Sequence, residues 1–178
     1  YQWSAGKWQP PPNVPLEKAF DKISFREGLE PDAQFFLLDG YSRGHHLQYD
    51  GNAITKFYAD GEDWLIDGDY LVRNTTDHNM LSLTKDGRCA QYEPTCAALE
   101  HLADLPTAAM VQTAVYDYIG ANWLRNIFWL KGGPVCVVDH VTAVEPGNFK
   151  CECIWKMLDR GERGGDDQRT FSLTRLAG

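Results

Sequence analysis

Polar side chains in the stretch SRGHHLQYDGN, residues 42–52, have the spacing of a chemical site. Alternate residues of an extended strand point to the same side, so four polar groups would project together here: His46, Gln48, Asp50 and Asn52. Imidazole, amide and carboxylate groups can move protons or bind a cation, so this pattern suits a cleft with acid–base or metal chemistry. A solvated turn between two strands is the alternative that this segment alone leaves open.

Two later residues extend the candidate site. Asp67 ends the apolar run DWLID, and His78 lies at the entry to the strand-like run HNMLSL. Histidine and aspartate side chains on neighbouring strands can meet around one metal ion or one substrate. The spacing by itself is a weak signal, because a single histidine at the start of a strand usually has a structural role.

The elements that must position these residues are strands. Alternating apolar runs are separated by DG, GG and PGN turns about every ten residues, the rhythm of antiparallel β structure. The sequence therefore predicts an all-β protein, an antiparallel β-sandwich with one or two short helices. One helix is expected near Thr95–Leu105, because residues 94–105 combine helical spacing with good helix formers.

The run NWLRNIFWL, residues 122–130, indicates how one strand is buried. One of its faces would carry Trp123, Arg125, Ile127 and Trp129. Both faces are largely apolar, which predicts a central strand that is covered on both sides. A tryptophan-rich face that stacks on sugar rings is the alternative.

The chain divides into two predicted parts. Residues 1–18 contain Trp3, Trp8 and the run PPPNVP, and are expected to be an extended segment that docks onto another surface. Residues 19–178 are expected to form the sandwich domain. We expect this domain to be truncated at one or both ends, because the sequence begins without Met and stops just after a strand-like run.

Composition excludes several classes of protein. The 178 residues, 43% of them hydrophobic, suit one globular domain with one core. The formal net charge of -8 argues against a general nucleic-acid binder, which needs a basic face. We expect no membrane span, because the sequence has no apolar window of about 18 residues.

Four segments follow one another in the order found in heparinase II/III-like polysaccharide lyases: FFLLDGYSRGHHLQYDGNAI, DWLIDGDY, DHNMLSL and GANWLRNIFWLKGGPVCVVDHVTAVEPGNFKCECIW. From about Phe20 to about Trp155, the sequence resembles the C-terminal β-sandwich region of that family. The resemblance implies a sandwich that packs against an α/α toroid domain from the same or another chain. It also implies β-elimination of uronic-acid-containing acidic polysaccharides, in the periplasm or outside the cell.

The resemblance assigns roles to individual residues. His46 matches the catalytic histidine that the sandwich supplies to the active cleft, and Asp67 and His78 match two ligands of a structural zinc ion. The third zinc ligand of the family pattern, a second histidine, corresponds to Gln48. The sequence departs from the pattern there, because a glutamine amide is a poor zinc ligand.

Substrate binding and the choice of function complete the expectations. Arg43, Gln48 and Asn52 could donate hydrogen bonds to an acidic substrate. In the family, further catalytic groups come from the toroid, and the chain has no long run of helical hairpins, so we do not expect it to be a complete lyase alone. The alternative function is a non-catalytic module that binds carbohydrate or protein. Gln48 favours that alternative, whereas His46, Asp67 and His78 favour the lyase component.

Overall fold

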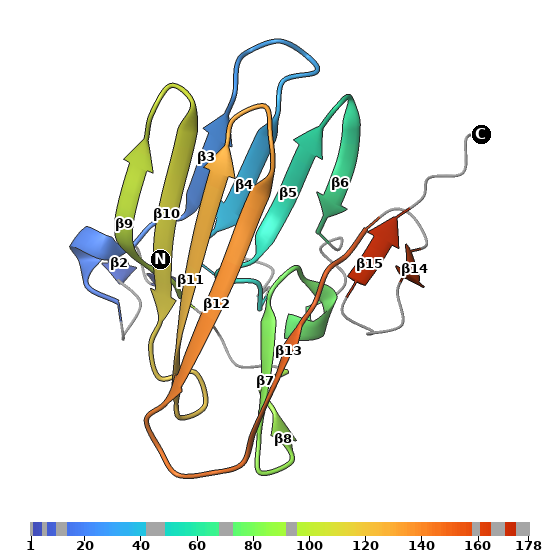
Figure 1. The fold of residues 1–178 in the computed structure, drawn as a ribbon. Coiled ribbons are helices and arrows are strands. Elements are labelled where there is room, and N and C mark those ends of the chain that lie inside the picture. The colour runs from blue at the N-terminus through green and yellow to red at the C-terminus, as the bar shows by residue number, and fades with distance from the viewer. Residues whose placement is uncertain are drawn as a thin grey trace.

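The computed structural model describes residues 2–4, 7–9, 14–41, 49–67, 73–91, 96–157, 161–164 and 170–173. In these ranges the chain consists of antiparallel strands and two short 3₁₀ turns, η1 (Leu16–Lys18) and η2 (Thr75–Asp77) (Figure 1). The predicted all-β sandwich is therefore confirmed. Among the described residues, no helix has the length and apolar character needed to cross a membrane.

Two four-stranded antiparallel sheets form the main sandwich (Figure 1). The first has the order β3-β4-β5-β6, with bounds Lys22–Arg26, Phe35–Asp39, Ile54–Ala59 and Glu62–Ile66. The second has the order β12-β11-β10-β9, with bounds Val135–Ala143, Ala121–Leu130, Ala108–Val115 and Ala98–Asp104. Asp60 and Gly61, between β5 and β6, have φ values of 54° and 77°, the left-handed conformation that tight DG hairpin turns require.

Shorter strands complete the described structure. A three-stranded sheet has the order β13-β7-β8, with bounds Phe149–Cys153, Leu81–Lys85 and Arg88–Cys89. Two hairpins lie near the ends of the chain: β1 (Gln2–Ser4) with β2 (Lys7–Gln9), and β14 (Gly161–Gly164) with β15 (Thr170–Leu173). The docking role of residues 1–18 and the truncation of the sandwich stay predictions.

Two large apolar clusters form most of the core of the described residues, and a small third one contains Val14, Cys96 and Ala98. Between the two large sheets pack Phe25, Phe36, Leu38, Ile54, Ala109, Val111, Ile127 and Trp129. A second cluster joins the other half of β11 to the small sheet and includes Met80, Leu81, Leu83, Val115, Tyr118 and Trp123. Each fully buried large apolar side chain contributes about 1.5–3 kcal/mol, so the inward face of β11 stabilises both halves of the fold.

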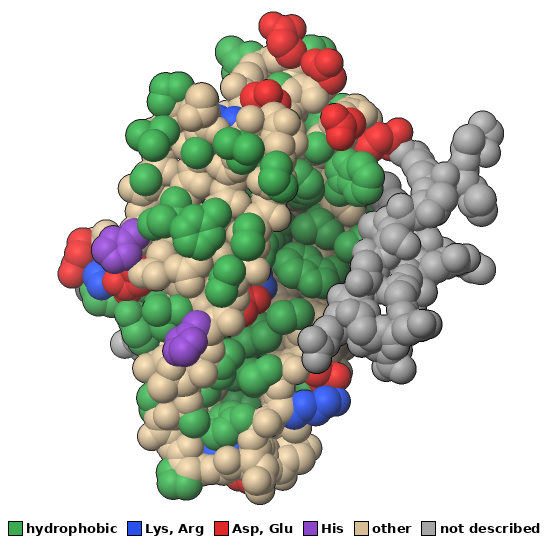
Figure 2. Space-filling model, in the orientation of Figure 1, with side chains coloured by type: hydrophobic (Ala, Val, Ile, Leu, Met, Phe, Trp, Pro, Cys, Tyr) green, Lys and Arg blue, Asp and Glu red, His purple; other side chains and the backbone are tan. Residues whose placement is uncertain are grey.

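The two faces of β11 differ in exposure. Trp123, Arg125, Ile127 and Trp129 are at most 2% exposed, which confirms the predicted inner face. On the other face, Phe128 is 45% and Leu130 is 54% exposed, so the prediction of cover on both sides is wrong for the described residues. An antiparallel sheet needs to bury only one face. Figure 2 shows hydrophobic side chains spread over the outward face of β9 to β12.

The predicted helix near Thr95–Leu105 is wrong. Residues 98–104 form the strand β9, which pairs with β10 from Ala98↔Ala114 to Asp104↔Ala109. The alanines, leucines and glutamate of this segment favour a helix in isolation. Pairing along β10 supplies a hydrogen-bond ladder and buries Ala98, and this tertiary context overrides a weak local preference.

Candidate functional site: a buried aspartate–histidine cluster

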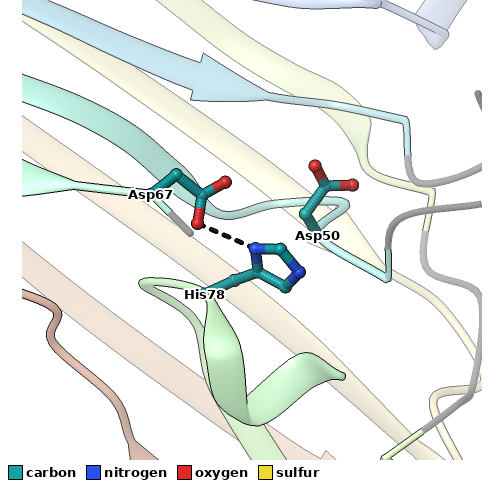
Figure 3. A group of neighbouring side chains, drawn as sticks. All are labelled: Asp50, Asp67 and His78. Carbon is teal, nitrogen blue, oxygen red and sulfur yellow. Dashed lines mark hydrogen bonds and ion pairs between the residues drawn. The ribbon is translucent and has the colours of Figure 1, made fainter. Parts of the chain in front are cut away.

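Asp50, Asp67 and His78 come together from three separate segments of the chain (Figure 3). Asp50 begins the turn before β5, Asp67 directly follows β6, and His78 directly follows η2. One ligand-type atom of each residue lies within 4.8 Å of the other two. The structure thus brings together the two residues, Asp67 and His78, for which the sequence predicted a metal, and adds a third.

A tight turn positions Asp50. The backbone N–H of Ala53 donates to the carbonyl of Asp50 at 2.8 Å, and that of Asn52 donates to the carbonyl of Asp39 at 2.7 Å. Asn52 has a φ of 74°, a left-handed conformation that asparagine tolerates better than most residues. The turn is therefore held by one hydrogen bond within it, from Ala53 to Asp50, and by one to Asp39 at the end of β4.

The turn η2 positions His78. The backbone N–H of Asn74 donates to the carboxylate of Asp77 at 3.2 Å, which closes the start of η2. The hydroxyl of the buried Thr75 donates to the carbonyl of Ala90 at 3.3 Å, which holds η2 against the chain after β8. His78 then enters the core with 1% of its surface exposed.

The imidazole of His78 lies between two carboxylates (Figure 3). Its Nδ1 is 2.7 Å from Oδ1 of Asp67, and the side chain of Asp67 is 16% exposed. Among the described residues, the buried atoms Nε2 of His78 and Oδ1 of Asp50 have no hydrogen-bond partner. Because Asp67 engages Nδ1, Nε2 is the ring nitrogen that is open to a ligand, an arrangement common for metal-bound histidines.

Burial and mutual repulsion change the protonation of this cluster. Burial, reinforced by the neighbouring Asp39 carboxylate, raises the pKa of Asp50 to about 7. Burial also raises the pKa of Asp39, although Nζ of Lys22 lies 2.5 Å from its carboxylate. For His78, burial opposes protonation, but the hydrogen bond and the charge of Asp67 raise the pKa of the imidazole overall. Crowded carboxylates of this kind hold protons or a cation in preference to bare negative charge.

The free energy of unfolding of the metal-free protein should fall as the pH rises from about 4, the ordinary pKa of aspartate, to about 7, the pKa of folded Asp50. In this window folded Asp50 keeps a proton that the unfolded chain has released. The slope from Asp50 is at most about 1.4 kcal/mol per pH unit. His78 acts in the same direction, since its stabilising contribution is lost as the pH rises through its raised folded pKa.

Urea denaturation at a series of pH values, with a chelator present, measures this dependence. The matched variant is Asp50→Asn, which keeps the shape of the side chain but cannot ionise. Its slope should be shallower than that of the unchanged protein. Identical slopes for the two proteins would contradict the assignment of the proton to Asp50.

The other sequence-predicted site residues fall into two groups. Arg43, His46 and Gln48 lie outside the described residues, so their roles stay predictions. Asn52 lies within the described residues and is fully buried. Its Oδ1 accepts a hydrogen bond from the hydroxyl of Thr113 at 2.6 Å. The contacts found for Asn52 are therefore those of a turn anchor, and its role in substrate binding stays a prediction.

Sequence reasoning placed Asp50 on the polar face of its strand but gave it no role. The available signal was chemical. A carboxylate is a far better metal ligand than the amide of Gln48 two positions earlier. Since the predicted strand would present both residues on one face, the carboxylate could have been named as the substitute for the missing histidine.

Comparisons with known proteins give a structural likeness. No protein-family model and no curated protein match the sequence. The heparan sulfate lyase HepC from Pedobacter heparinus superposes with a TM-score of 0.60 at 20% identity, over 81% of this chain and 24% of that chain. A HepC mutant gives 0.65 at 19% identity, over 89% and 27%. A heparinase III structure gives 0.60 at 19% identity, over 81% and 24%. The chain shares the fold of the matched part of these heparinase III structures.

The β-sandwich fold that the resemblance of the sequence motifs implied is the fold that this chain shares with the matched part of the heparinase III structures. The chain spans about a quarter of the length of the heparinase III structures it matches. At 16–20% identity the likeness concerns the fold. Activity and substrate have to be argued from the site.

Proposed function

We propose that this chain is the β-sandwich portion of a heparinase II/III-like polysaccharide lyase and supports β-elimination of uronic-acid-containing acidic polysaccharides. The observation that carries this proposal is the fold shared with the heparan sulfate lyase HepC. The buried cluster adds support, because Asp50 follows the candidate catalytic residue His46 after only three intervening residues. Such a lyase would work in the periplasm or outside the cell.

The chemistry begins with removal of the proton next to the uronate carboxylate. That proton is weakly acidic, so donors must balance the charge that develops on the carboxylate. We assign His46 as the base or as a donor to the carboxylate, and Arg43 and Gln48 as further donors. The remaining acid or base comes, in this proposal, from an α/α toroid domain of the same or another chain, which also encloses the polysaccharide.

The cluster fits a metal ion, with zinc as the proposed ion. The buried atoms Oδ1 of Asp50 and Nε2 of His78, which lack a partner among the described residues, would hold the ion, and Asp67, bonded to Nδ1, would orient the imidazole. A cation there would neutralise the carboxylates and cross-link the turn before β5 to the segment after η2. Its contribution would be structural support for the segment that carries His46.

Replacing Gln48 with histidine should tighten zinc binding and enlarge the rise in melting temperature on addition of zinc. Structural zinc usually has four protein ligands, and the new imidazole would supply one that the family pattern has and this chain lacks. A metal bound by the folded state alone adds about 2.7 kcal/mol when its concentration is one hundred times Kd. Thermal unfolding during zinc titration of both proteins measures the difference.

A glutamine-to-histidine change away from the cluster provides the control. Gln112 lies on β10, where its amide donates to Asn126 at 2.6 Å, and Gln112→His should leave the zinc response unchanged. Equal responses of the unchanged protein and the Gln48 variant would show that position 48 has no part in metal binding.

Formation of 4,5-unsaturated uronate tests the proposed function. The complete product of the reading frame that contains this chain is incubated with heparan sulfate and other acidic glycans, and the absorbance of the unsaturated product is followed. A rise in absorbance that depends on the enzyme supports the lyase. Absence of product with every acidic glycan rejects it.

The second candidate is a non-catalytic module that binds carbohydrate or protein. The observation in its favour is Gln48, which replaces a histidine of the family pattern. Its signature would be saturable binding of a glycan or a protein domain without any unsaturated product.

A further inference from the structure

Arg125 lies in β11 with 0% of its surface exposed. Its guanidinium is held by Asp139, the residue opposite it on β12: Nε donates to Oδ1 at 2.8 Å, and Nη2 donates to Oδ2 at 2.9 Å. A bidentate ion pair of this kind fixes the plane of the guanidinium and balances its buried charge. The third nitrogen, Nη1, can therefore donate elsewhere.

Nη1 of Arg125 donates to backbone carbonyls of two separate segments. The carbonyl of Asn52 accepts at 2.8 Å, and that of Asn79 accepts at 3.2 Å. Asn52 lies in the turn that begins at Asp50, and Asn79 directly follows His78. One buried guanidinium thus ties the turn that carries Asp50 to the segment that carries His78.

The side chain of Asn79 extends these ties to the third member of the cluster. Asn79 is 0% exposed, and its Nδ2 donates to the carbonyl of Ile66 at 2.8 Å and to that of Ile54 at 2.9 Å. Ile66 directly precedes Asp67. Each of the three cluster residues therefore lies within two positions of a carbonyl that Arg125 or Asn79 holds.

We infer that Arg125 is a positioning residue for the candidate site, which sets the spacing between Asp50 and His78 through the carbonyls of Asn52 and Asn79. The inference rests on the proposed function for what the site does, and on the contacts above for the positioning itself. Lysine cannot replace this arginine, because a single ammonium group cannot donate two hydrogen bonds to the Asp139 carboxylate and also one to each of the two carbonyls. Without the guanidinium, both carbonyls lose a buried donor and the two segments lose their common anchor.

The variant Arg125→Lys tests the inference in the chain itself. NMR signals of the His78 imidazole nitrogens report the Asp67–His78 pair, and hydrogen exchange reports the bonds of the amides of Ala53 and Ile54 to the carbonyls of Asp50 and Asn79. We expect the imidazole signals to shift. We expect exchange at the two amides to accelerate about ten- to hundredfold relative to the amides of β10, the factor that corresponds to one hydrogen bond to a charged group.

Ile127→Ala is the matched control. Ile127 follows Arg125 on the same inward face of β11 and is 2% exposed, but it packs in the cluster between the two large sheets. Its loss should destabilise the whole fold and leave the imidazole signals and the relative exchange unchanged. Thr113→Val, which removes the donor to Oδ1 of Asn52, should accelerate exchange at Ala53 without shifting the His78 signals.

Unchanged His78 signals in Arg125→Lys, with exchange like that of the Ile127 control, would overturn the inference. If Arg125→Lys does not fold, Asp139→Asn is measured in its place, because it keeps the donors but removes the charge that orients them, and the same two readouts apply. Neither readout uses a glycan. A protein that makes no unsaturated uronate but shows displaced His78 signals rejects the proposed lyase and supports the positioning role.

Discussion

Replacing His46 with alanine should lower the rate of unsaturated-uronate formation about 10²- to 10⁴-fold, the usual contribution of one general acid or base. In the proposed reaction His46 either takes the proton next to the uronate carboxylate or donates to that carboxylate. Both roles act on the transition state, so kcat/KM should fall while the melting temperature changes little. The measurement is the initial rate of absorbance increase with heparan sulfate as substrate.

The neighbouring histidine provides a matched control. His45 has the same chemistry, but in the extended strand that the sequence predicts it would point to the opposite side from His46. His45→Ala should keep most of the activity. Equal losses for the two variants would mean that the reaction does not distinguish the two faces of this segment, and the assignment of His46 would be wrong.

Replacing Asp139 with alanine should lower the free energy of unfolding by about 3–5 kcal/mol, because it leaves the charge of Arg125 buried without its partner. The side chain of Asp139 is 9% exposed and also accepts a hydrogen bond from Nε1 of Trp123 at 2.8 Å. The variant therefore loses three hydrogen bonds between β11 and β12. Urea denaturation gives the difference in free energy.

A partly exposed ion pair at the edge of the same sheet, between Lys131 after β11 and Asp104 at the end of β9, serves for comparison. Nζ of Lys131 lies 2.6 Å from Oδ1 of Asp104, whose side chain is 57% exposed. Asp104→Ala should cost no more than about 1 kcal/mol, because water screens such a pair. If the two aspartate variants lose similar amounts, the pair of Arg125 and Asp139 contributes no more than a surface contact.

Hairpins and buried strand faces were the most predictable parts of the fold. The DG turn at Asp60-Gly61 has the expected left-handed geometry, and the apolar residues of β11 with period two identified its inner face. The exposed side of β11 was not predictable, since Phe128 and Leu130 are as apolar as core residues. The segment that forms β9 was predicted to be a helix, because its alanines and leucines have high helix propensity. Nothing in the segment itself indicates that it pairs with β10.

The candidate site was predictable only in part, for a similar reason. Asp67 and His78 stood out as polar residues at the ends of apolar runs, and they are hydrogen-bonded. The residues that hold the site in place, Arg125 and Asn79, could not be identified from a sequence pattern. Arg125 and Asn79 donate hydrogen bonds to backbone carbonyls. Because every residue has a carbonyl, no residue type or spacing in the sequence predicts which carbonyl will accept.

The pairing of β7 with β13 also has a consequence for the order of events during synthesis. β7 pairs through all five of its residues with β13, from Leu81↔Cys153 to Lys85↔Phe149, and with β8 only at Thr84 and Lys85. On the ribosome, β7 is complete long before β13, because every strand from β8 to β12 must be translated in between. Until β13 arrives, Leu81 and Leu83 belong to a nascent strand with an open edge, the kind of segment that pairs with other chains. The small sheet should therefore form after the two large sheets, and a chaperone that shields β7 should raise the yield of folded protein.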